Sequence, residues 1–314
     1  MHGREPAFSA SAHTMPTHII GAHTVDNGGI HMTALRAGSA GMKALQCFTA
    51  IPKFYGDKST IKPERVERFR RALDEAGIEP RNVVVHAAYV LSVATAEPDK
   101  WVRAAAGLAK EMERSNALGV GAVCFHPGSA TDGDPKAAAE RVAKAITQAL
   151  KSVDGPTRLL VENTAGAGKT VGRTAEEVAD ILRHVPDELR GRTGYGLDTC
   201  HLFASGWAIH ESAQKLREIL DEWEQTTGER PGFFHLNDSE GAFASNRDRH
   251  MLLGDGQIGA EPFRWLLADP RSQGIPLILE TPQQNYDIGD DDSSADPYDL
   301  RMMELLTGFL KKEK

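Results

Sequence analysis

The sequence predicts an α/β protein built as a single (β/α)8 TIM barrel. Short apolar runs recur along the chain, and six of them end in a His, Asp or Glu side chain. The six end residues are His86, His126, Glu162, Asp198, His235 and Glu280. They follow one another at intervals of 36 to 45 residues, enough for one strand, one helix and two loops. Parallel strands buried on both faces read as continuous apolar runs and need helical crossovers. The 314 residues also suit one barrel, which takes roughly 250 residues or more.

The first half of the chain supplies four strand-helix units. The expected strands are 18–23, 43–48, 82–86 and 121–126, and the expected helices are about 30–40, 63–76, 97–118 and 135–150. Pro63 and Pro98 suit first helical turns, because the missing N–H of proline is not needed there. Gly77 and Gly119 lie just past the expected helix ends, where glycine accepts a left-handed conformation.

The second half supplies four more units. The expected strands are 159–162, 194–198, 232–238 and 276–280, and the expected helices are 174–183, 211–227, 261–267 and 300–311. Thr174 followed by Glu177 predicts a capping box. A long loop separates the seventh strand from the helix near Glu261. The acidic stretch Asp287–Asp299 reads as an insertion after the eighth strand.

The composition excludes several classes of protein. The chain has 44 acidic and 36 basic residues, a net charge of −8, which argues against a generally basic nucleic-acid binder. No apolar segment approaches the roughly 20 residues of a membrane span. Of the three cysteines, Cys47 and Cys124 lie in apolar runs and fit buried thiols in a reducing cytoplasm. Residues 1–17 lack the apolar core of a signal peptide, so we expect a flexible extension before one domain over 18–314.

Nine ligand-type side chains are expected to meet at the carboxyl ends of the strands, where such barrels have their active sites. They are His86, His126, Glu162, Asp198, His201, His235, Asp248, His250 and Glu280. Any one of them alone is more readily explained as a core polar group or a helix cap. Together they include four carboxylates, which would repel one another unless cations lay between them. Mixed imidazole and carboxylate ligands suit zinc, or manganese or iron.

Two glycine-rich segments imitate nucleotide-binding motifs. Gly166–Thr170 resembles the end of a P-loop, but the required first glycine falls on Asn163. Gly254–Gly259 has the spacing of a dinucleotide fingerprint, but it follows a polar loop instead of a first strand. We reject both motifs, and expect Gly254–Gly259 to form a backbone nest that receives a phosphate.

Six motifs therefore stand out along the chain. They are His126-Pro127-Gly128, Glu162-Asn163-Thr164-Ala165-Gly166, Leu197-Asp198-Thr199-Cys200-His201, His235-Leu236-Asn237-Asp238-Ser239, Asp248-Arg249-His250 and Pro276-Leu277-Ile278-Leu279-Glu280-Thr281. Their order and spacing resemble the endonuclease IV family of apurinic/apyrimidinic (AP) endonucleases, within the xylose isomerase-like TIM barrel superfamily. The resemblance covers about residues 18–280.

The resemblance implies a site with three zinc ions, in part replaceable by manganese or iron. The first ion would be held by His86 and His126, with Glu162 bridging it to the second. The second would be completed by Asp198, His235 and Glu280, and the third would be held by His201, Asp248 and His250. The family hydrolyses the phosphodiester 5′ to an abasic site in duplex DNA during base excision repair. The products are a 3′-hydroxyl and a 5′-deoxyribose phosphate, and Glu162 and Glu280 would orient or deprotonate the attacking water.

The resemblance also implies DNA contacts by a protein expected to act as a monomer. Lys53 falls where the family has an arginine that enters the DNA stack. Tyr89 matches the family's wedging tyrosine, with Val90 beside it where leucine is common, and Arg249 is a further expected contact. The chain departs from the family in the loop 50–55, in Trp207-Ala208 after the sixth strand and in the acidic insertion. We expect these departures to affect DNA affinity and damage specificity more than the metal chemistry.

Two other functions compete with this one. A sugar isomerase or epimerase on the same barrel would use a single metal held by Glu162, Asp198, His235 and Glu280. The other five ligand-type residues would then be surplus. A catalytically inactive DNA-binding barrel would be expected to lack some ligands, and none of the nine is missing.

Overall fold

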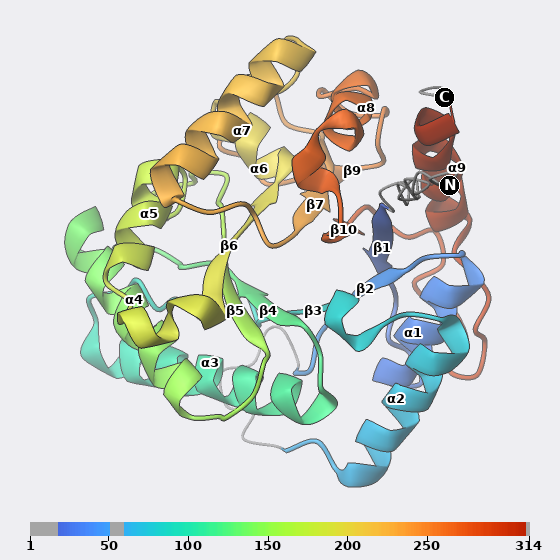
Figure 1. Cartoon of the computed structure of the whole chain (residues 1–314), viewed down its shortest axis with the longest axis horizontal. Coiled ribbons are helices and arrows are strands. Elements are labelled where there is room, and N and C mark those ends of the chain that lie inside the picture. Colours follow the sequence, from blue (N-terminus) through green and yellow to red (C-terminus); the bar gives the residue numbers. More distant parts are fainter. Residues whose placement is uncertain (1–17, 51–59, 312–314) are drawn as a thin grey trace, which may run out of the picture.

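The computed structural model describes residues 18–50 and 60–311, and within them eight parallel strands close into a barrel (Figure 1). The order around the barrel is β1-β2-β3-β4-β5-β6-β7-β10, and β10 pairs with β1 to close it. The strands are β1 (Ile19–His23), β2 (Ala44–Cys47), β3 (Val83–His86), β4 (Ala122–Phe125), β5 (Arg158–Glu162), β6 (Thr193–Asp198), β7 (Phe234–Leu236) and β10 (Pro276–Leu279). This confirms the predicted barrel. The expected extension over 1–17 and the expected DNA contact Lys53 lie outside the described residues.

Helices surround the barrel and alternate with its strands (Figure 1). They are α1 (Ile30–Ser39), α2 (Pro63–Ala76), α3 (Pro98–Leu118), α4 (Pro135–Lys151), α5 (Ala175–Arg183), α7 (Ala213–Thr227), α8 (Glu261–Ala268) and α9 (Pro297–Lys311). Gly77, Gly119 and Gly228 end α2, α3 and α7 in the left-handed conformation, as expected for the first two from their positions. Among the helices that the structure describes, none has the length and apolar content to cross a bilayer.

Three short elements near the carboxyl ends of the strands were not predicted. α6 (Thr199–Ala204) begins directly after Asp198, whose carboxylate accepts a hydrogen bond from the N–H of His201 at 2.8 Å. β8 (Asp238–Ser239) and β9 (His250–Met251) pair antiparallel, where the sequence predicted only a strand end and a loop. Three 3-10 helices also lead into strands: η1 (Pro80–Asn82), η2 (Asp187–Arg192) and η3 (Pro270–Ser272).

The predicted capping box of α5 is half formed. The Thr174 hydroxyl accepts a hydrogen bond from the N–H of Glu177 at 3.2 Å, as expected. The Glu177 carboxylate does not return to Thr174. It accepts instead from the N–H groups of Gly172 and Arg173, both at 2.9 Å. The loop before α5 is thereby tied to the first turn of the helix.

A small apolar cluster, separate from the main hydrophobic core, is contributed by the barrel strands and by the residue before β7. It consists of Val84, Ala122, Cys124, Leu160 and Phe233, all buried. A Cβ at Gly196 on β6 would overlap the ring of Phe233, so this position requires glycine. The Phe233 ring lies 4.7 Å from the ring of His235, centroid to centroid, and forms part of the floor of the site above. The three cysteines are buried free thiols, as predicted for Cys47 and Cys124.

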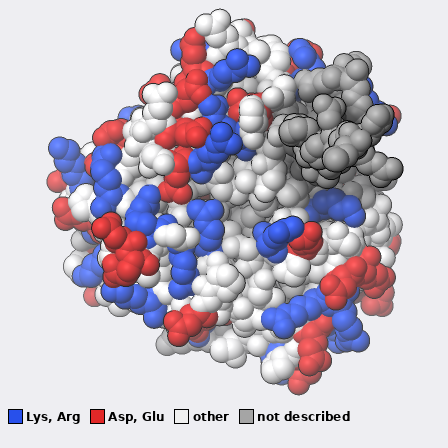
Figure 2. Space-filling view, in the orientation of Figure 1, with Lys and Arg blue, Asp and Glu red and all other residues white. Residues whose placement is uncertain are grey.

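Charges of both signs are intermixed on the outer surface. On the face shown in Figure 2, Lys and Arg side chains alternate with Asp and Glu side chains over the helices, and the middle of the face carries few charges. The net negative charge of the chain is therefore not gathered into one acidic patch on this face.

The acidic stretch after β10 is an ordered segment, which we call the strap (residues 281–296). Asp296 organises it, because its carboxylate accepts hydrogen bonds from the N–H groups of Gln284, Asn285 and Tyr298 at 2.8 to 3.1 Å. The expected start of the last helix at Leu300 was wrong, since α9 begins at Pro297. The acidic stretch was predicted as an insertion from its composition. Composition cannot distinguish an acidic residue that caps backbone N–H groups, such as Asp296, from one in a solvated loop.

Asp299, in the first turn of α9, contacts the strap and gives the stability of the protein a predicted pH dependence. Its carboxyl is 1% exposed and accepts a hydrogen bond from Gln283 Nε2 at 2.8 Å. Burial raises the pKa of Asp299 to about 7; the Gln283 hydrogen bond opposes the rise and Asp296 adds to it. Between about pH 4 and pH 7 the folded chain therefore holds a proton that the unfolded chain has lost. The free energy of unfolding consequently falls as the pH rises through this window.

We expect Asp299→Asn to remove this dependence, because asparagine keeps the acceptor for Gln283 and carries no charge. Relative to the parent protein, the variant should gain roughly 2–4 kcal/mol in the free energy of unfolding between pH 4 and pH 8. Urea unfolding of both proteins at the two pH values measures this difference. Asp287→Asn, at an exposed strap position, is the matched control and should show no such gain. Parallel pH curves for parent and Asp299→Asn would contradict the argument.

Candidate metal centre

The nine predicted ligand-type residues come together at the carboxyl ends of the barrel strands. Their potential ligand atoms form three groups, and the atoms of each group lie within 4.8 Å of one another. The groups are His86, His126 and Glu162; Glu162, Asp198, His235 and Glu280; and His201, Asp248 and His250. Glu162 belongs to two groups and joins them. The structure therefore brings together the members of each ligand set that the resemblance implied.

Three of the histidines are oriented by backbone carbonyl groups. His86 Nδ1 donates to the carbonyl of the next residue at 2.7 Å. His201 Nδ1 donates to the carbonyl of Asn163 at 2.9 Å. His250 Nδ1 donates to the carbonyl of Glu280 at 3.2 Å. Because a carbonyl can only accept, the proton is placed on Nδ1, and Nε2 is left free to coordinate a cation.

His235 is oriented by the side chain of Gln46, which was not among the predicted site residues. Its Nε2 donates to Oε1 of Gln46 at 2.7 Å, and its Nδ1 faces Glu162 Oε1 at 2.9 Å. The amide of Gln46 also donates to the carboxylate of Glu280. Gln46 is fully buried on β2 and so fixes two members of one group at once. A neutral amide inside an apolar run gives no periodic signal, but a buried Gln at the end of a predicted strand is itself unusual.

Glu162 is the carboxylate around which the imidazoles gather. One oxygen lies 3.3 Å from His86 Nε2 and 3.8 Å from His126 Nε2, and the other lies 3.3 Å from His201 Nδ1. Glu162 Oε2 is buried and has no hydrogen-bond partner, and the same is true of His250 Nε2. Buried polar atoms without a partner are costly, and a cation held in each of the two groups to which these atoms belong would satisfy each of them.

The electrostatics of the cluster favour added positive charge. Burial lowers the pKa of His86, but the carboxylates of Glu162 and Glu280 outweigh burial and raise it to about 9. Burial raises the pKa of Glu280, yet His235 and the neighbouring imidazoles hold it at about 2. Protons are thus favoured on His86, His201, His235 and His250 beside anionic carboxylates, whereas burial lowers the pKa of His126. Divalent cations would compete with these protons for the same nitrogen atoms, so binding should release protons.

Comparison with known proteins agrees with this geometry. Residues 35–303 match the family model described as xylose isomerase-like TIM barrel. The chain is 35% identical to "Probable endonuclease 4" of Chlorobium limicola over 268 residues, which are 85% of this chain and 91% of the relative. It is 36% identical to the protein of the same name from Chloroflexus aurantiacus, over 84% of this chain and 91% of the relative.

The chain belongs to the endonuclease IV family. The crystal structure of endonuclease IV from Thermus thermophilus superposes with a TM-score of 0.77 at 32% identity, covering 93% of this chain and 99% of that one. A D-tagatose 3-epimerase-like protein also superposes, with a TM-score of 0.62, over 86% of this chain and 89% of that one. Its identity is 15%, so this likeness shows the shared barrel fold alone.

In this member of the endonuclease IV family, two asparagines brace the carboxylates. Asn163 Oδ1 accepts from the N–H of Asp198 at 2.6 Å. Asn237 donates from Nδ2 to Asp198 Oδ2 at 2.6 Å and to Glu280 Oε2 at 3.3 Å. Both asparagines lie within motifs visible in the sequence, but no role was predicted for either of them. Asn163 directly follows Glu162, and Asn237 lies two residues after His235. This closeness to predicted ligands was the sequence feature that could have indicated their role.

Two cysteines lie among the ligand-type groups, but their thiols are poor metal ligands because they hold their protons tightly. Cys124 lies with Glu162 and His235, and Cys200 lies with Asp198 and His250. Burial raises the pKa of the Cys124 thiol well above its usual range and that of Cys200 to about 12. A thiol must lose its proton to bind a metal, so the imidazoles and carboxylates are the better donors here.

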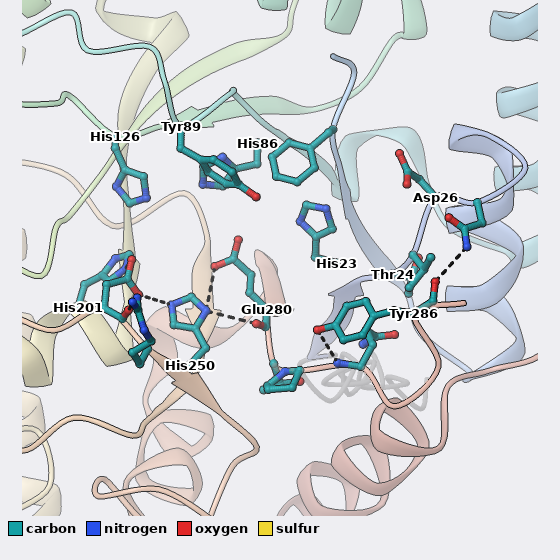
Figure 3. A pocket seen from close by; sticks show the side chains of 18 residues that line it. His23, Thr24, Asp26, His86, Tyr89, His126, His201, His250, Glu280 and Tyr286 are labelled. Atoms are coloured by element: carbon teal, nitrogen blue, oxygen red, sulfur yellow. Dashed lines mark hydrogen bonds and ion pairs between the residues drawn. The ribbon is translucent and has the colours of Figure 1, made fainter. Parts of the chain in front are cut away.

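A pocket of about 730 Å³ opens above the cluster (Figure 3). Tyr89 and Arg249, two of the expected DNA contacts, line it, and the Tyr89 ring is 56% exposed. Val90 does not line the pocket and packs partly buried against the core. Glu280, directly after β10, lines the pocket together with Asp26 and Asp248, whereas Glu162 is fully buried beneath it.

The glycine-rich loop Gly254–Gly259 does form a nest of N–H groups, but the expectation that it receives a phosphate was wrong. Asp238 Oδ2 accepts from the N–H groups of Gly254, Gly256 and Gly259 at 2.9 to 3.2 Å. Its Oδ1 accepts from Ile258 at 2.8 Å and from the adjacent N–H of residue 239 at 2.7 Å. An internal carboxylate therefore occupies the nest.

The rejected P-loop pattern is a surface loop, as its sequence context indicated. Thr170 forms an isolated antiparallel bridge with Ser129 of the loop after β4. The N–H of Ala130 donates to the carbonyl of Lys169 at 2.9 Å. The helix begins only at Ala175, so no helix N-terminus follows the glycines directly.

Proposed function

We propose that this protein is a DNA-repair AP endonuclease that hydrolyses the phosphodiester 5′ to an abasic site in duplex DNA. The products would be a 3′-hydroxyl and a 5′-deoxyribose phosphate. The observation that carries the proposal is the convergence of nine imidazole and carboxylate side chains in a chain of the endonuclease IV family. The open pocket above them has room for a sugar and its phosphate.

The donor set fits a cluster of three zinc ions. The ions would be held by the groups around Glu162, with His201, Asp248 and His250 holding the third. Glu162 Oε2 and His250 Nε2 are buried and have no hydrogen-bond partner. They support this assignment, because burying a polar or charged atom without a partner costs free energy that a bound cation would offset. Bound divalent cations supply Lewis acidity and neutralise developing negative charge in phosphodiester hydrolysis.

The protein's own side chains divide the remaining work. Glu280 lines the pocket and belongs to the same ligand group as Glu162, so its carboxylate is placed to orient a water molecule and accept its proton. Gln46 and Asn237 hold that carboxylate from below. Arg249 offers the pocket a cation for a DNA phosphate, and Tyr89 offers an exposed ring for the gap left by the missing base.

We expect the purified protein to nick a duplex oligonucleotide at a single abasic position and to leave the same duplex uncut when it carries no lesion. Prolonged chelation should abolish the cleavage, and added zinc should restore it. Gel analysis of the end-labelled strand identifies the 3′-hydroxyl product. An undiminished rate after metal removal, or equal cutting of the undamaged duplex, would refute the proposal.

Metal analysis separates this function from the single-metal sugar isomerase. About three ions per chain are expected for the nuclease and about one for the isomerase. Elemental analysis of the protein as purified and after zinc loading makes the measurement. The five ligand-type residues outside the isomerase quartet lie in the same cluster, and this favours the higher count.

A further inference from the structure

A second pocket, of about 720 Å³, opens at the amino ends of the barrel strands, opposite the metal centre. We call it the amino-end pocket. Its lining includes residues that begin or directly precede five strands: Ile19 of β1, Lys43 before β2, Asn82 before β3, Arg158 of β5 and Pro276 of β10. Barrels of this kind carry out their chemistry at the carboxyl ends of the strands, so this pocket is not expected to serve catalysis. A volume of this size suits a small organic molecule.

The floor of the amino-end pocket is apolar. It includes three members of the small apolar cluster described above, Val84, Ala122 and Leu160. The two other members of that cluster lie against the metal centre. Cys124 Sγ lies within 4.8 Å of potential ligand atoms of Glu162 and His235, and the Phe233 ring lies 4.7 Å from the ring of His235, centroid to centroid. The cluster therefore separates the amino-end pocket from the metal centre, and it offers apolar surface to the body of an organic ligand.

The charges around this floor are mostly positive. The described residues that line the pocket include three cations and one carboxylate, namely Lys43, Arg81, Arg158 and Glu79. Arg81 and Glu79 form an exposed ion pair at 2.6 Å, so their charges largely cancel. Lys43 is exposed, and its Nζ makes one weak contact, with the carbonyl of Gly77 at 3.5 Å. Lys43 and Arg158 therefore carry the excess positive charge, which attracts an anion.

The hydrogen-bonding capacity of Arg158 is only partly used by the chain. Its Nη2 donates to the carbonyl of Thr193 at 2.8 Å and lies 3.6 Å from the Glu229 carboxylate. Arg190 lies closer to the same carboxylate, at 2.9 Å, so two guanidinium groups share one negative charge. Arg158 Nε is buried and has no hydrogen-bond partner, which is unusual for a buried donor. Arg158 Nη1 lies beside Gly232, where a Cβ would come within 3.2 Å of it, so glycine leaves space next to this nitrogen.

We propose that the amino-end pocket binds a small organic anion, with its oxyanion group held by Arg158 and Lys43 and its apolar part on the floor of Val84, Ala122 and Leu160. A guanidinium suits this role because its N–H groups match the oxygen atoms of a phosphate, sulfonate or carboxylate, and the lysine adds a point charge. The site is separate from the phosphodiester chemistry proposed for the carboxyl ends of the strands, and it holds whether or not that proposal does.

Titration calorimetry on the zinc-loaded protein tests this site with three probes. Naphthalenesulfonate carries both an oxyanion and an apolar body, methanesulfonate carries the oxyanion with little apolar surface, and naphthol carries the apolar body without the charge. We expect naphthalenesulfonate to bind at least about tenfold more tightly than either of the others, because only this probe uses both the floor and the cations. Its affinity should fall as the salt concentration rises, since salt screens the charge attraction.

Substitutions at the two ends of the barrel locate the bound probe. Arg158→Gln should weaken naphthalenesulfonate by at least about tenfold, since a charged hydrogen bond is lost. Lys43→Gln should weaken it about threefold, and its exposed position keeps the fold out of question. Neither variant should change naphthol binding. Lys215→Gln, on the outer helix α7, is the matched control for loss of a lysine and should bind like the parent.

Arg249→Gln is the control for the pocket above the metal centre, which Arg249 lines, and it should also bind naphthalenesulfonate like the parent. Weaker binding in Arg249→Gln, together with unchanged binding in Arg158→Gln and Lys43→Gln, would place the anion in the pocket above the metal centre and overturn the proposal. An absence of naphthalenesulfonate binding to the parent protein at millimolar concentration would overturn it as well, and would show that the amino-end pocket is a solvated mouth of the barrel.

Discussion

Replacing Glu162 with glutamine is expected to lower kcat for abasic-site cleavage by at least a factor of about a hundred while the barrel stays folded. The Glu162 carboxylate lies within 4 Å of His86, His126 and His201 and accepts from His235 at 2.9 Å. Glutamine has the same shape but no charge, and its NH2 group would face imidazole nitrogens whose lone pairs are needed for cations. The two ligand groups that Glu162 joins would both lose affinity for metal.

The measurements are single-turnover cleavage of the abasic duplex, elemental analysis and circular dichroism. We expect fewer bound ions per chain together with an unchanged far-ultraviolet spectrum. Glu177→Gln is the matched control, because its carboxylate also accepts two hydrogen bonds but lies on α5 away from the cluster. A Glu162→Gln variant with full activity and a full complement of ions would remove the bridging role.

The ligand cluster could be predicted because its members lie at strand ends. In a parallel barrel every strand points its carboxyl end to the same face, so a periodic series such as His86, Glu162 and Glu280 must converge there. Asp248 and His250 were assigned to the third ion only through the resemblance. The structure explains their approach by the pairing of β8 with β9, which brings His250 opposite Ser239. Strands of two residues are too short to leave a pattern in the sequence.

The partners of buried polar groups could not be predicted in the same way. Gln46 contacts His235 from 189 residues away, and no local rule relates these positions. The strap shows a related failure, because composition alone cannot separate an acidic residue that faces solvent from Asp296, which caps three backbone N–H groups. Whether a polar side chain faces solvent or caps buried groups depends on which buried donors and acceptors still need a partner. These groups can be identified only once the fold is known.

The Asp238 carboxylate in the nest of Gly254–Gly259 is the clearest example of such a buried acceptor, and replacing it should have a large effect on stability. Asp238 is fully buried, and its carboxylate accepts five hydrogen bonds from backbone N–H groups, four of them from the loop Gly254–Gly259. In Asp238→Asn an NH2 group would face N–H donors, which leaves at least two of them without an acceptor. We expect a loss of about 3 kcal/mol or more in the free energy of unfolding. For a chain of this size the melting temperature should fall by about 6–12 °C.

The loss should extend to the metal centre, because Asp238 sits in β8 and His250 in its partner β9. Loosening that pair would weaken cation binding by His201, Asp248 and His250 more than by the group around His86. Asp255→Asn is the matched control from the same loop: Asp255 forms an exposed ion pair with Arg301 at 2.6 Å and should cost less than about 1 kcal/mol. Thermal unfolding and metal titration of both variants make the comparison. An Asp238→Asn protein as stable as Asp255→Asn would show that the loop holds its shape without the buried carboxylate.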